Sequence, residues 1–222
     1  MILLVNINVK RVRGASTMKM QDIKTLITSG TIILAVALYM IFGRAPADEN
    51  VTTSSNQQGI ISIDEVEEKT GNERFTVEFI KAYDGDTIQA MVEGQKQKIR
   101  LLMVDTPEMN YQKGDLQPYA QEAMDYTVKL LENAQKIEAV YDVGSQTDKY
   151  DRLLAYVFVD DVLLQESLLN EGLAAVRFIY KPNNTMEEEF REIEQMAQEK
   201  KLNVWSYENY LQKDGFHPEV VN

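Results

Sequence analysis

The hydrophobic pattern divides the chain into three parts. No charged residue occurs from Thr25 to Gly43, and the stretch that follows is mostly small and polar. Further along, apolar positions recur with the periods of strands and helices. The pattern predicts one folded domain over residues 72–206, with a flexible linker at 44–71 before it and a solvated tail at 207–222 after it.

The first part of the predicted domain has the pattern of three short strands. Apolar, aromatic and β-branched residues dominate residues 75–83, 87–92 and 99–104. Asp, Gly and Pro interrupt these runs, and connections this short allow only antiparallel pairing. We therefore expect an antiparallel meander.

The rest of the domain alternates between helical and strand periods. We expect three helices and two further strands, the helices at 119–134, 162–171 and 186–200 and the strands at 137–141 and 153–159. Thr185 and Glu188 have the spacing of a capping box that would open the last helix. Five short strands and three helices favour an α+β, mainly β fold, a small closed five-stranded barrel of the OB type.

The N-terminal segment has the features of an export signal or a membrane anchor. A basic stretch, residues 1–24, precedes the uncharged run 25–43, which is roughly long enough to cross a bilayer core. Its most apolar part, residues 32–42, is as short as a signal-peptide core, and Ala45-Pro46-Ala47 offers a cleavage site. Cleavage and retention both remain open. In either case basic flanks stay in the cytoplasm, so the domain is expected outside it.

Composition and charge limit the kinds of site that the protein can form. The 222 residues include no cysteine and a single histidine, His217, which excludes disulfides, thiolate metal sites and multi-histidine metal sites. The formal net charge is −12 although the first 47 residues are basic, so the remainder is strongly acidic. Such a field slows association with nucleic acid. We attribute it mainly to solvated helix faces, above all the acidic residues of 186–200.

Three polar clusters stand out at predicted strand ends: residues 84–87, 100–108 and 148–152. Taken singly, each has a structural explanation: Asp-Gly is a common hairpin turn, Thr-Pro ends a strand, and the third cluster has ordinary loop composition. Taken together, they suggest a site, because a meander brings alternate strand ends to one rim.

Carboxylates at that rim would suit a hard divalent cation. Asp86, Asp105 and Glu108 supply the acidic oxygens that Ca²⁺ or Mg²⁺ prefers. Thr106, held extended by Pro107, could add its carbonyl oxygen.

Two arginines enter apolar strands beside these carboxylates. Arg100 and Arg152 cannot lose their charge, so each needs an anionic partner. With a bound cation they would form a phosphate clamp, with Glu108 placed to activate water. For Arg100 a purely structural ion pair remains the alternative.

These motifs resemble, in order and spacing, the staphylococcal (micrococcal) nuclease family. The resemblance spans about residues 72–206 and rests on five segments: Asp84-Gly85-Asp86-Thr87, residues 100–108, Asp148-Lys149-Tyr150-Asp151-Arg152, residues 180–185 and residues 201–206. It implies an OB-fold domain that hydrolyses DNA and RNA to 3′-phosphorylated products with Ca²⁺.

The resemblance also implies roles for individual residues. Asp86, Asp105 and the Thr106 carbonyl would bind calcium, Arg100 and Arg152 would stabilise the phosphate, and Glu108 would be the general base. Lys149, Tyr150, Phe178 and Tyr180 would line the nucleotide pocket, and Asp84 would lie near the ion without a defined role.

Two positions depart from the family pattern. Phe178 stands where the best-known member has Tyr, so a stacking surface is kept and a hydroxyl is lost. Asp151 stands where Gly is usual, and its carboxylate could pair with Arg152 or weaken the attraction of phosphate.

The sequence therefore predicts an extracytoplasmic, monomeric, calcium-dependent nuclease, bound to the membrane if the N-terminal segment is retained. The alternative is a module of the same fold that binds nucleic acid or protein with little or no catalysis. A zinc hydrolase or redox protein lacks the necessary ligands.

Overall fold

The computed structural model describes residues 60–109 and 115–221. The predictions for residues 1–24, for the apolar segment 25–43 and for the first part of the linker lie outside these ranges. Within them, no helix is both long enough and apolar enough to cross a membrane.

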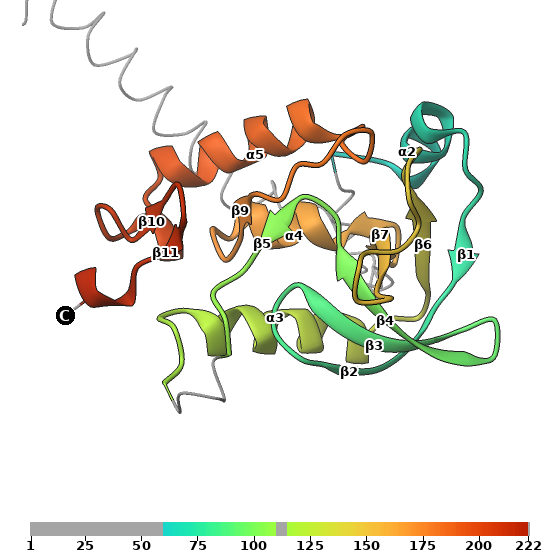
Figure 1. Ribbon diagram of the computed structural model, residues 1–222, viewed down its shortest axis with the longest axis horizontal. Coiled ribbons are helices and arrows are strands. Elements are labelled where there is room, and N and C mark those ends of the chain that lie inside the picture. Colours follow the sequence, from blue (N-terminus) through green and yellow to red (C-terminus); the bar gives the residue numbers. More distant parts are fainter. Residues whose placement is uncertain (1–59, 110–114, 222) are drawn as a thin grey trace, which may run out of the picture. The chain divides into compact units, whose positions relative to one another are not determined.

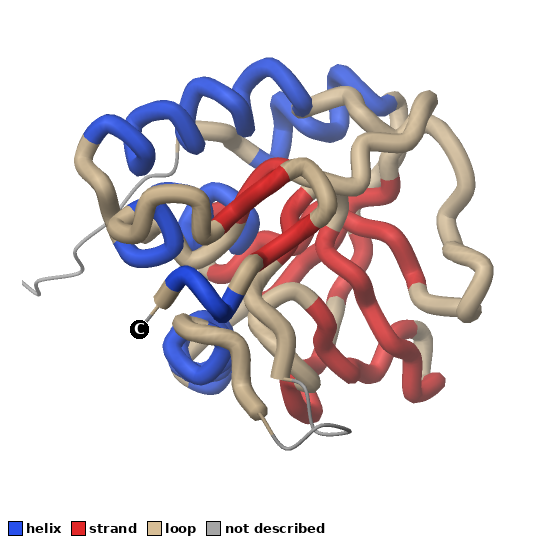
Figure 2. Tube along the Cα trace, turned by 60° about the vertical axis from the view of Figure 1, so that its left-hand side comes forward, coloured by secondary structure: helices blue, strands red, loops and turns tan. Residues whose placement is uncertain are grey.

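Short strands and four α-helices make up the described chain (Figure 1). The helices are α2 (Ile63–Thr70), α3 (Ala120–Glu132), α4 (Leu164–Asn170) and α5 (Glu187–Glu199). The strands are β1 (Phe75–Thr76), β2 (Glu78–Ala82), β3 (Thr87–Val92), β4 (Gln95–Leu101), β5 (Val104–Asp105), β6 (Ile137–Tyr141), β7 (Leu153–Val159), β8 (Val162–Leu163), β9 (Ala175–Val176), β10 (Leu211–Gln212) and β11 (Gly215–Phe216). Helices gather on one side of the strands (Figure 2).

The main sheet has the order β1-β6-β7-β4-β3-β2, with β8 paired to β7. Strands β2, β3 and β4 pair antiparallel, as the predicted meander requires, and β4 runs parallel to β7. The path is open, so the described strands form no closed hydrogen-bonded ring of the predicted kind. Its two ends, β1 and β2, are consecutive pieces of chain separated only by Val77, whose N–H donates to the carbonyl of Ile137 at 3.0 Å. The α+β class is confirmed.

One strand boundary differs from the prediction. The strand expected at 99–104 spans Gln95–Leu101, and a turn with Met103 at φ 58° separates it from β5. The first residues of β4 are polar and largely exposed, whereas its last three are buried. An apolar run therefore marked only the buried end of the strand.

The interpretation of residues 60–71 as linker is wrong. Ser62 caps α2, and Ile61, Ile63 and Val66 are buried in the core. The carboxylate of Glu166 accepts the N–H groups of Ile60 and Ile61 at 2.7 and 3.0 Å. Acidic residues between the apolar positions hid this amphipathic helix, whose main anchor lies about a hundred residues away in the sequence.

The predicted capping box is also absent. Met186 is the N-cap of α5 without a side-chain cap bond, and Thr185 instead bonds to Asp142, which accepts the Tyr156 hydroxyl at 2.6 Å. On α5, Glu188, Glu192 and Glu199 are exposed and Glu187 and Glu189 are half-buried. Glu194 is buried and accepts the N–H of Val176 at 2.7 Å. That acidic residue serves the fold and is not solvated.

The predicted solvated tail is folded. Strands β10 and β11 form a hairpin, and Tyr210 before it is fully buried. The Tyr210 hydroxyl donates to the carbonyl of Pro118 at 2.5 Å, and its ring contacts Phe216 and Tyr119. Aromatic residues scattered through a polar sequence supply this packing.

Replacing Val66 with Ala tests whether α2 belongs to the domain. Because Val66 is fully buried, we expect the free energy of unfolding to fall by about 2 kcal/mol. Urea denaturation measures it, and Glu68→Ala, an exposed change on the same helix, should leave stability nearly unchanged. Equal effects of the two changes would show that α2 does not contribute to the core.

Candidate active site

A tight turn between β2 and β3 positions the first carboxylate. Asp84 Oδ1 accepts the N–H groups of Asp86 and Thr87 at 3.0 and 2.6 Å. At Gly85 a Cβ would lie 2.7 Å from Thr106 Cγ2, so a larger residue would force the turn away from its neighbours. The turn holds Asp86 inward, where it is 3% exposed.

Arg100 is the centre of the cluster. Its Nη1 donates to the carbonyls of Leu101 and Val104 at 2.8 and 2.7 Å. Its Nε lies 3.1 Å from Asp86 Oδ1, and its Nη2 lies 3.6 Å from Asp105 Oδ1. The ion pairs considered as the structural alternative are therefore present, and they fix the guanidinium between two carboxylates.

Thr106 joins this cluster through Asp86. Asp86 Oδ2 accepts the Thr106 N–H at 2.8 Å and its hydroxyl at 3.3 Å, and Thr106 is buried. The structure thus brings together all three expected calcium-binding residues and one of the two expected phosphate-binding arginines.

Glu108 faces the same cluster from the loop after β5. Gln117 holds its backbone on both sides: Oε1 accepts the Glu108 N–H at 2.6 Å, and the Gln117 N–H donates to the Glu108 carbonyl at 3.2 Å. Although the residue is exposed by surface area, partial burial of the carboxyl group, followed by the charge of Asp86, raises the pKa of Glu108. Arg100 and Arg152 oppose this rise, which places both guanidiniums within electrostatic reach.

The carboxyl groups of the cluster repel one another. Burial, followed by the charges of Asp86 and Glu108, raises the pKa of Asp84 to about 8. Burial and the charge of Asp86 raise the pKa of Asp105 to about 6, against the opposing effect of Arg100 and Arg177. At Asp105 and Glu108, burial and the charge of Asp86 thus outweigh the attraction of the neighbouring arginines.

These donors fit a hard divalent cation by their chemistry. Buried carboxylate oxygens with raised pKa values would be stabilised in the charged form by a neighbouring cation. Within residues 60–109 and 115–221, no three Asp, Glu, His or Cys side chains form a metal-binding group by themselves. A cation would therefore need the two carboxylates of Asp86 and Asp105 together with backbone and solvent oxygens.

Arg152 and the expected nucleotide-binding residues form a second, more exposed group. Arg152 Nε pairs with Asp148 Oδ2 at 2.7 Å, and its guanidinium carbon lies 5.6 Å from the centre of the Tyr150 ring. The Nζ of Lys149 lies 4.9 Å from the centre of the same ring. The ring centre of Phe178 lies 5.5 Å from the guanidinium carbon of Arg100.

Tyr180 is less firmly connected to this group. The residue is 68% exposed, and its hydrogen bond in the described chain joins its backbone to that of Asn183. Of the four expected nucleotide-binding residues, Phe178 and Tyr150 thus contact the two arginines, and Lys149 contacts Tyr150. Tyr180 has no such contact among the described residues.

Comparison with known proteins agrees with this geometry. Residues 98–207 match the family described as staphylococcal nuclease homologues. The chain is 35% identical over 180 residues to the thermonuclease of Staphylococcus intermedius, covering 81% of this chain and 97% of that protein. The chain belongs to the staphylococcal nuclease family.

Two further relatives come from Bacillus subtilis (strain 168). Endonuclease YncB is 43% identical over 137 residues, and SPbeta prophage-derived endonuclease YokF is 41% identical over 137 residues. Each match covers 62% of this chain, but only 64% of the first relative and 46% of the second. The predicted family is confirmed, and the chain spans less than two thirds of these two relatives.

Asp151, at the position where the resemblance implies Gly, adopts a left-handed backbone with φ 58°. That conformation explains a preference for Gly, because it strains most residues that carry a Cβ. Arg152 pairs with Asp148, and the described contacts include none between the carboxylate of Asp151 and Arg152. Of the two alternatives for Asp151, the described chain does not show the pairing with Arg152, and the weaker attraction of phosphate stays a prediction.

Arg177 is a member of the cluster that the sequence analysis missed. Its Nη1 donates to Asp105 Oδ2 at 2.8 Å, and its guanidinium lies 5.2 Å from the centre of the Phe178 ring. Nη2 lies 3.5 Å from the carbonyl of Lys213 in the C-terminal hairpin, and a Cβ on Gly215 would come within 3.2 Å of Nη1. The signal was available, since Arg177 is a charged residue directly after the apolar stretch Leu173–Val176, as Arg100 is within its strand.

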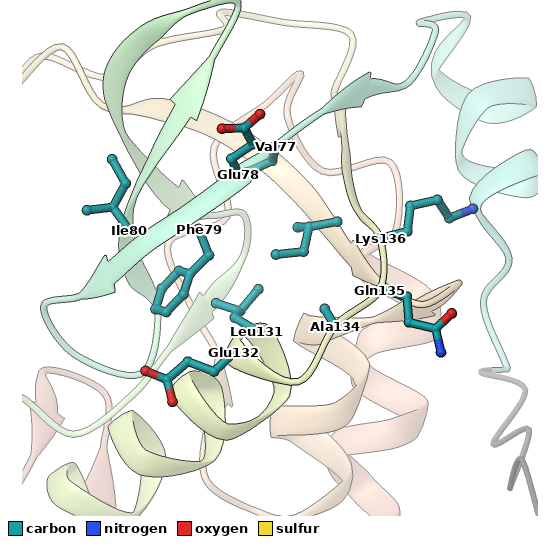
Figure 3. A pocket seen from close by; sticks show the side chains of 10 residues that line it. Val77, Glu78, Phe79, Ile80, Leu131, Glu132, Ala134, Gln135 and Lys136 are labelled. Carbon is teal, nitrogen blue, oxygen red and sulfur yellow. The ribbon is translucent and has the colours of Figure 1, made fainter.

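A separate groove lies between β2, the end of α3 and the start of β6 (Figure 3). It has a volume of about 410 Å³, and Phe79, Leu131 and Lys136 are among the residues that line it. None of the clustered carboxylates or arginines lines it, so it is not part of the candidate active site.

Replacing Asp151 with Gly separates its backbone effect from its charge. We expect Gly to stabilise the protein by up to about 1 kcal/mol, because it adopts the left-handed region without strain. Nuclease activity should be equal or higher. Asp151→Ala, which removes the same carboxylate but keeps the strain, is the matched control in urea denaturation and activity assays. A fall in activity with both variants would show that the carboxylate assists Arg152.

Arg177→Ala should destabilise the fold, because it removes the link between Asp105 and the C-terminal hairpin. Removing a partner of the buried Asp105 carboxylate is expected to lower the free energy of unfolding by about 1–3 kcal/mol. Lys213→Ala is the control, because Lys213 offers Arg177 only its backbone carbonyl. Denaturation curves that coincide for the two variants would remove Arg177 from this role.

Proposed function

We propose that this protein is a calcium-dependent nuclease that hydrolyses phosphodiester bonds of DNA and RNA and leaves 3′-phosphorylated products. The observation that carries the proposal is the cluster of Asp86, Arg100 and Asp105, with Glu108 beside it and Arg152 within electrostatic reach of Glu108. Family membership supports the reaction, and the geometry supports the assignment of its residues.

The two arginines would bind and stabilise the phosphate. Arg100 is held rigidly by two backbone carbonyls, so it presents a fixed charge at little entropic cost. The side-chain contact of Arg152 in the described chain uses Nε on Asp148, which leaves both Nη groups for a phosphate oxygen. Charge that develops on the phosphate during attack would be neutralised from two directions.

Glu108 would take the proton from the attacking water. Its backbone is fixed by Gln117, and its raised pKa brings the carboxyl group nearer to neutral, where a general base works best. Because Arg100 and Arg152 both lie within electrostatic reach of Glu108, the water would be activated next to a phosphate that the two guanidiniums hold.

Asp86, Asp105 and the carbonyl oxygen of Thr106 would hold the calcium ion. When bound, such an ion supplies positive charge that stabilises the transition-state phosphate. Asp86 and Asp105 are already oriented by Thr106, Arg100 and Arg177, so little reorganisation of these side chains would be needed.

The exposed aromatic group would receive the nucleotide. Tyr150 and Phe178 lie beside Arg152 and Arg100, where a base can stack while its phosphate meets the arginines. Lys149 and Tyr180 complete this proposed surface. Phe178 provides a stacking face without a hydroxyl.

We also propose that the protein acts outside the cytoplasm as a monomer. The uncharged run 25–43 after a basic stretch supports export, by cleavage or as an anchor to the membrane. Determining the mature N-terminus of the exported protein would distinguish the two.

Glu108→Gln tests the assignment of the base. We expect the rate of DNA cleavage in Ca²⁺ to fall on the order of 10²-fold or more, because Gln keeps the size but cannot accept the proton. A fluorescent DNA substrate measures it, and Glu93→Gln, at an exposed turn, is the matched control.

The same assay in excess chelator tests the metal. Activity should disappear with chelator and return with added Ca²⁺. Equal cleavage in both conditions would contradict the calcium assignment, and binding of DNA without cleavage in any condition would favour the alternative of a binding module.

A further inference from the structure

Two lysines share one aromatic ring at the edge of the candidate active site. The Nζ of Lys81 lies 4.5 Å from the centre of the Tyr83 ring, and the Nζ of Lys98 lies 4.7 Å from the same point. Neither ammonium group forms an ion pair with a carboxylate in the described part of the chain, although the chain has 35 acidic residues. Two like charges over one ring repel each other, and an anion between them would relieve that repulsion.

Strand register places this cluster beside Arg100. Arg100 pairs with Thr87, and the Tyr83 N–H donates to the Thr87 carbonyl at 2.8 Å, so Tyr83, directly after β2, continues the row that Thr87 and Arg100 form on β3 and β4. Cross-strand partners lie on the same face of a sheet. The ring of Tyr83 and the guanidinium of Arg100 therefore emerge on one face.

The next row on that face carries the lysines. Gln89 pairs with both Lys81 and Lys98, two residues along each strand from the row of Arg100. Side chains two residues apart point to the same side, about 7 Å apart along a strand. Arg100, Lys98 and Lys81 thus form a continuous basic track over β4, β3 and β2, with Tyr83 inside it.

We propose that this track binds the substrate strand beyond the scissile phosphate. Its ligand would be single-stranded polynucleotide, with a neighbouring phosphate between Lys81 and Lys98 and a base on the face of Tyr83. The inference rests on the proposed function, since it takes Arg100 as the position of the phosphate that is cut.

Such a track would explain how a strongly acidic protein holds a polyanion. The protein carries a formal net charge of −12, and the acidic residues of α5 lie on another element of the fold. Attraction over a Debye length of about 10 Å depends on the local charge, not on the net charge. A short basic surface next to Arg100 is sufficient to guide one strand to the site.

Binding of a fluorescent oligothymidylate in excess chelator tests the proposal without cleavage. We expect Lys81→Ala/Lys98→Ala to raise Kd about tenfold and to reduce the slope of log Kd against log salt by about 1.4, the value for two lost contacts with a single strand. Lys136→Ala/Lys200→Ala removes the same two charges from other parts of the molecule and is the matched control. Unchanged affinity and slope in the first variant would overturn the proposal.

Tyr83 provides a second test that does not alter charge. Tyr83→Ala should raise Kd about tenfold by removing a stacking surface, and Tyr83→Phe should restore wild-type binding. If Tyr83→Phe binds as poorly as Tyr83→Ala, the ring does not stack a base.

Cleavage assays then separate this proposal from the proposed function. With Ca²⁺, the preference of the enzyme for long oligothymidylate over a dinucleotide should fall about tenfold in Lys81→Ala/Lys98→Ala, because a dinucleotide is too short to reach the track. A wild-type protein that binds the oligonucleotide through these lysines but cuts neither substrate would contradict the nuclease assignment and leave the binding track standing.

Discussion

The burial of the Arg100 guanidinium is the constraint on which the site depends. An arginine cannot lose its charge, so its removal from water is tolerated only where anions and carbonyls surround it. Here Asp86 and Asp105 supply the charge, and the carbonyls of Leu101 and Val104 supply the remaining acceptors. The end of β4, the turn after it and the start of β5 are thus folded around one side chain.

The same constraint couples fold and chemistry. Burial of these carboxyl groups, followed by their mutual repulsion, raises the pKa values of Asp84, Asp105 and Glu108. A bound cation would remove this repulsion and leave the guanidiniums for the phosphate. The C-terminal hairpin, which lies outside residues 98–207 of the family match, also helps to hold the carboxylate cluster. Arg177 provides the link, because it bonds to both Asp105 and the carbonyl of Lys213.

The sequence predicts the site better than it predicts the periphery of the fold. Asp86, Arg100, Asp105 and Glu108 lie at strand ends or in short turns, where local rules determine which side chains meet. Residues 60–71 and 207–222 were misjudged because their partners, Glu166 and Pro118, are remote in sequence. Thr185 failed as a cap for the same reason, since Asp142 competes for its hydroxyl. Short polar segments can be fixed by tertiary contacts that no local pattern reveals.

Chemical denaturation at neutral pH, in Ca²⁺ and in chelator, tests the carboxylate cluster most directly. We predict that Ca²⁺ raises the free energy of unfolding, by about 2.7 kcal/mol when its concentration is a hundred times Kd. The increase should vanish in Asp86→Asn and Asp105→Asn and persist in Glu93→Gln. Identical unfolding curves of the wild-type protein with and without Ca²⁺ would contradict the claim that Asp86 and Asp105, held in place by Arg100, bind a cation.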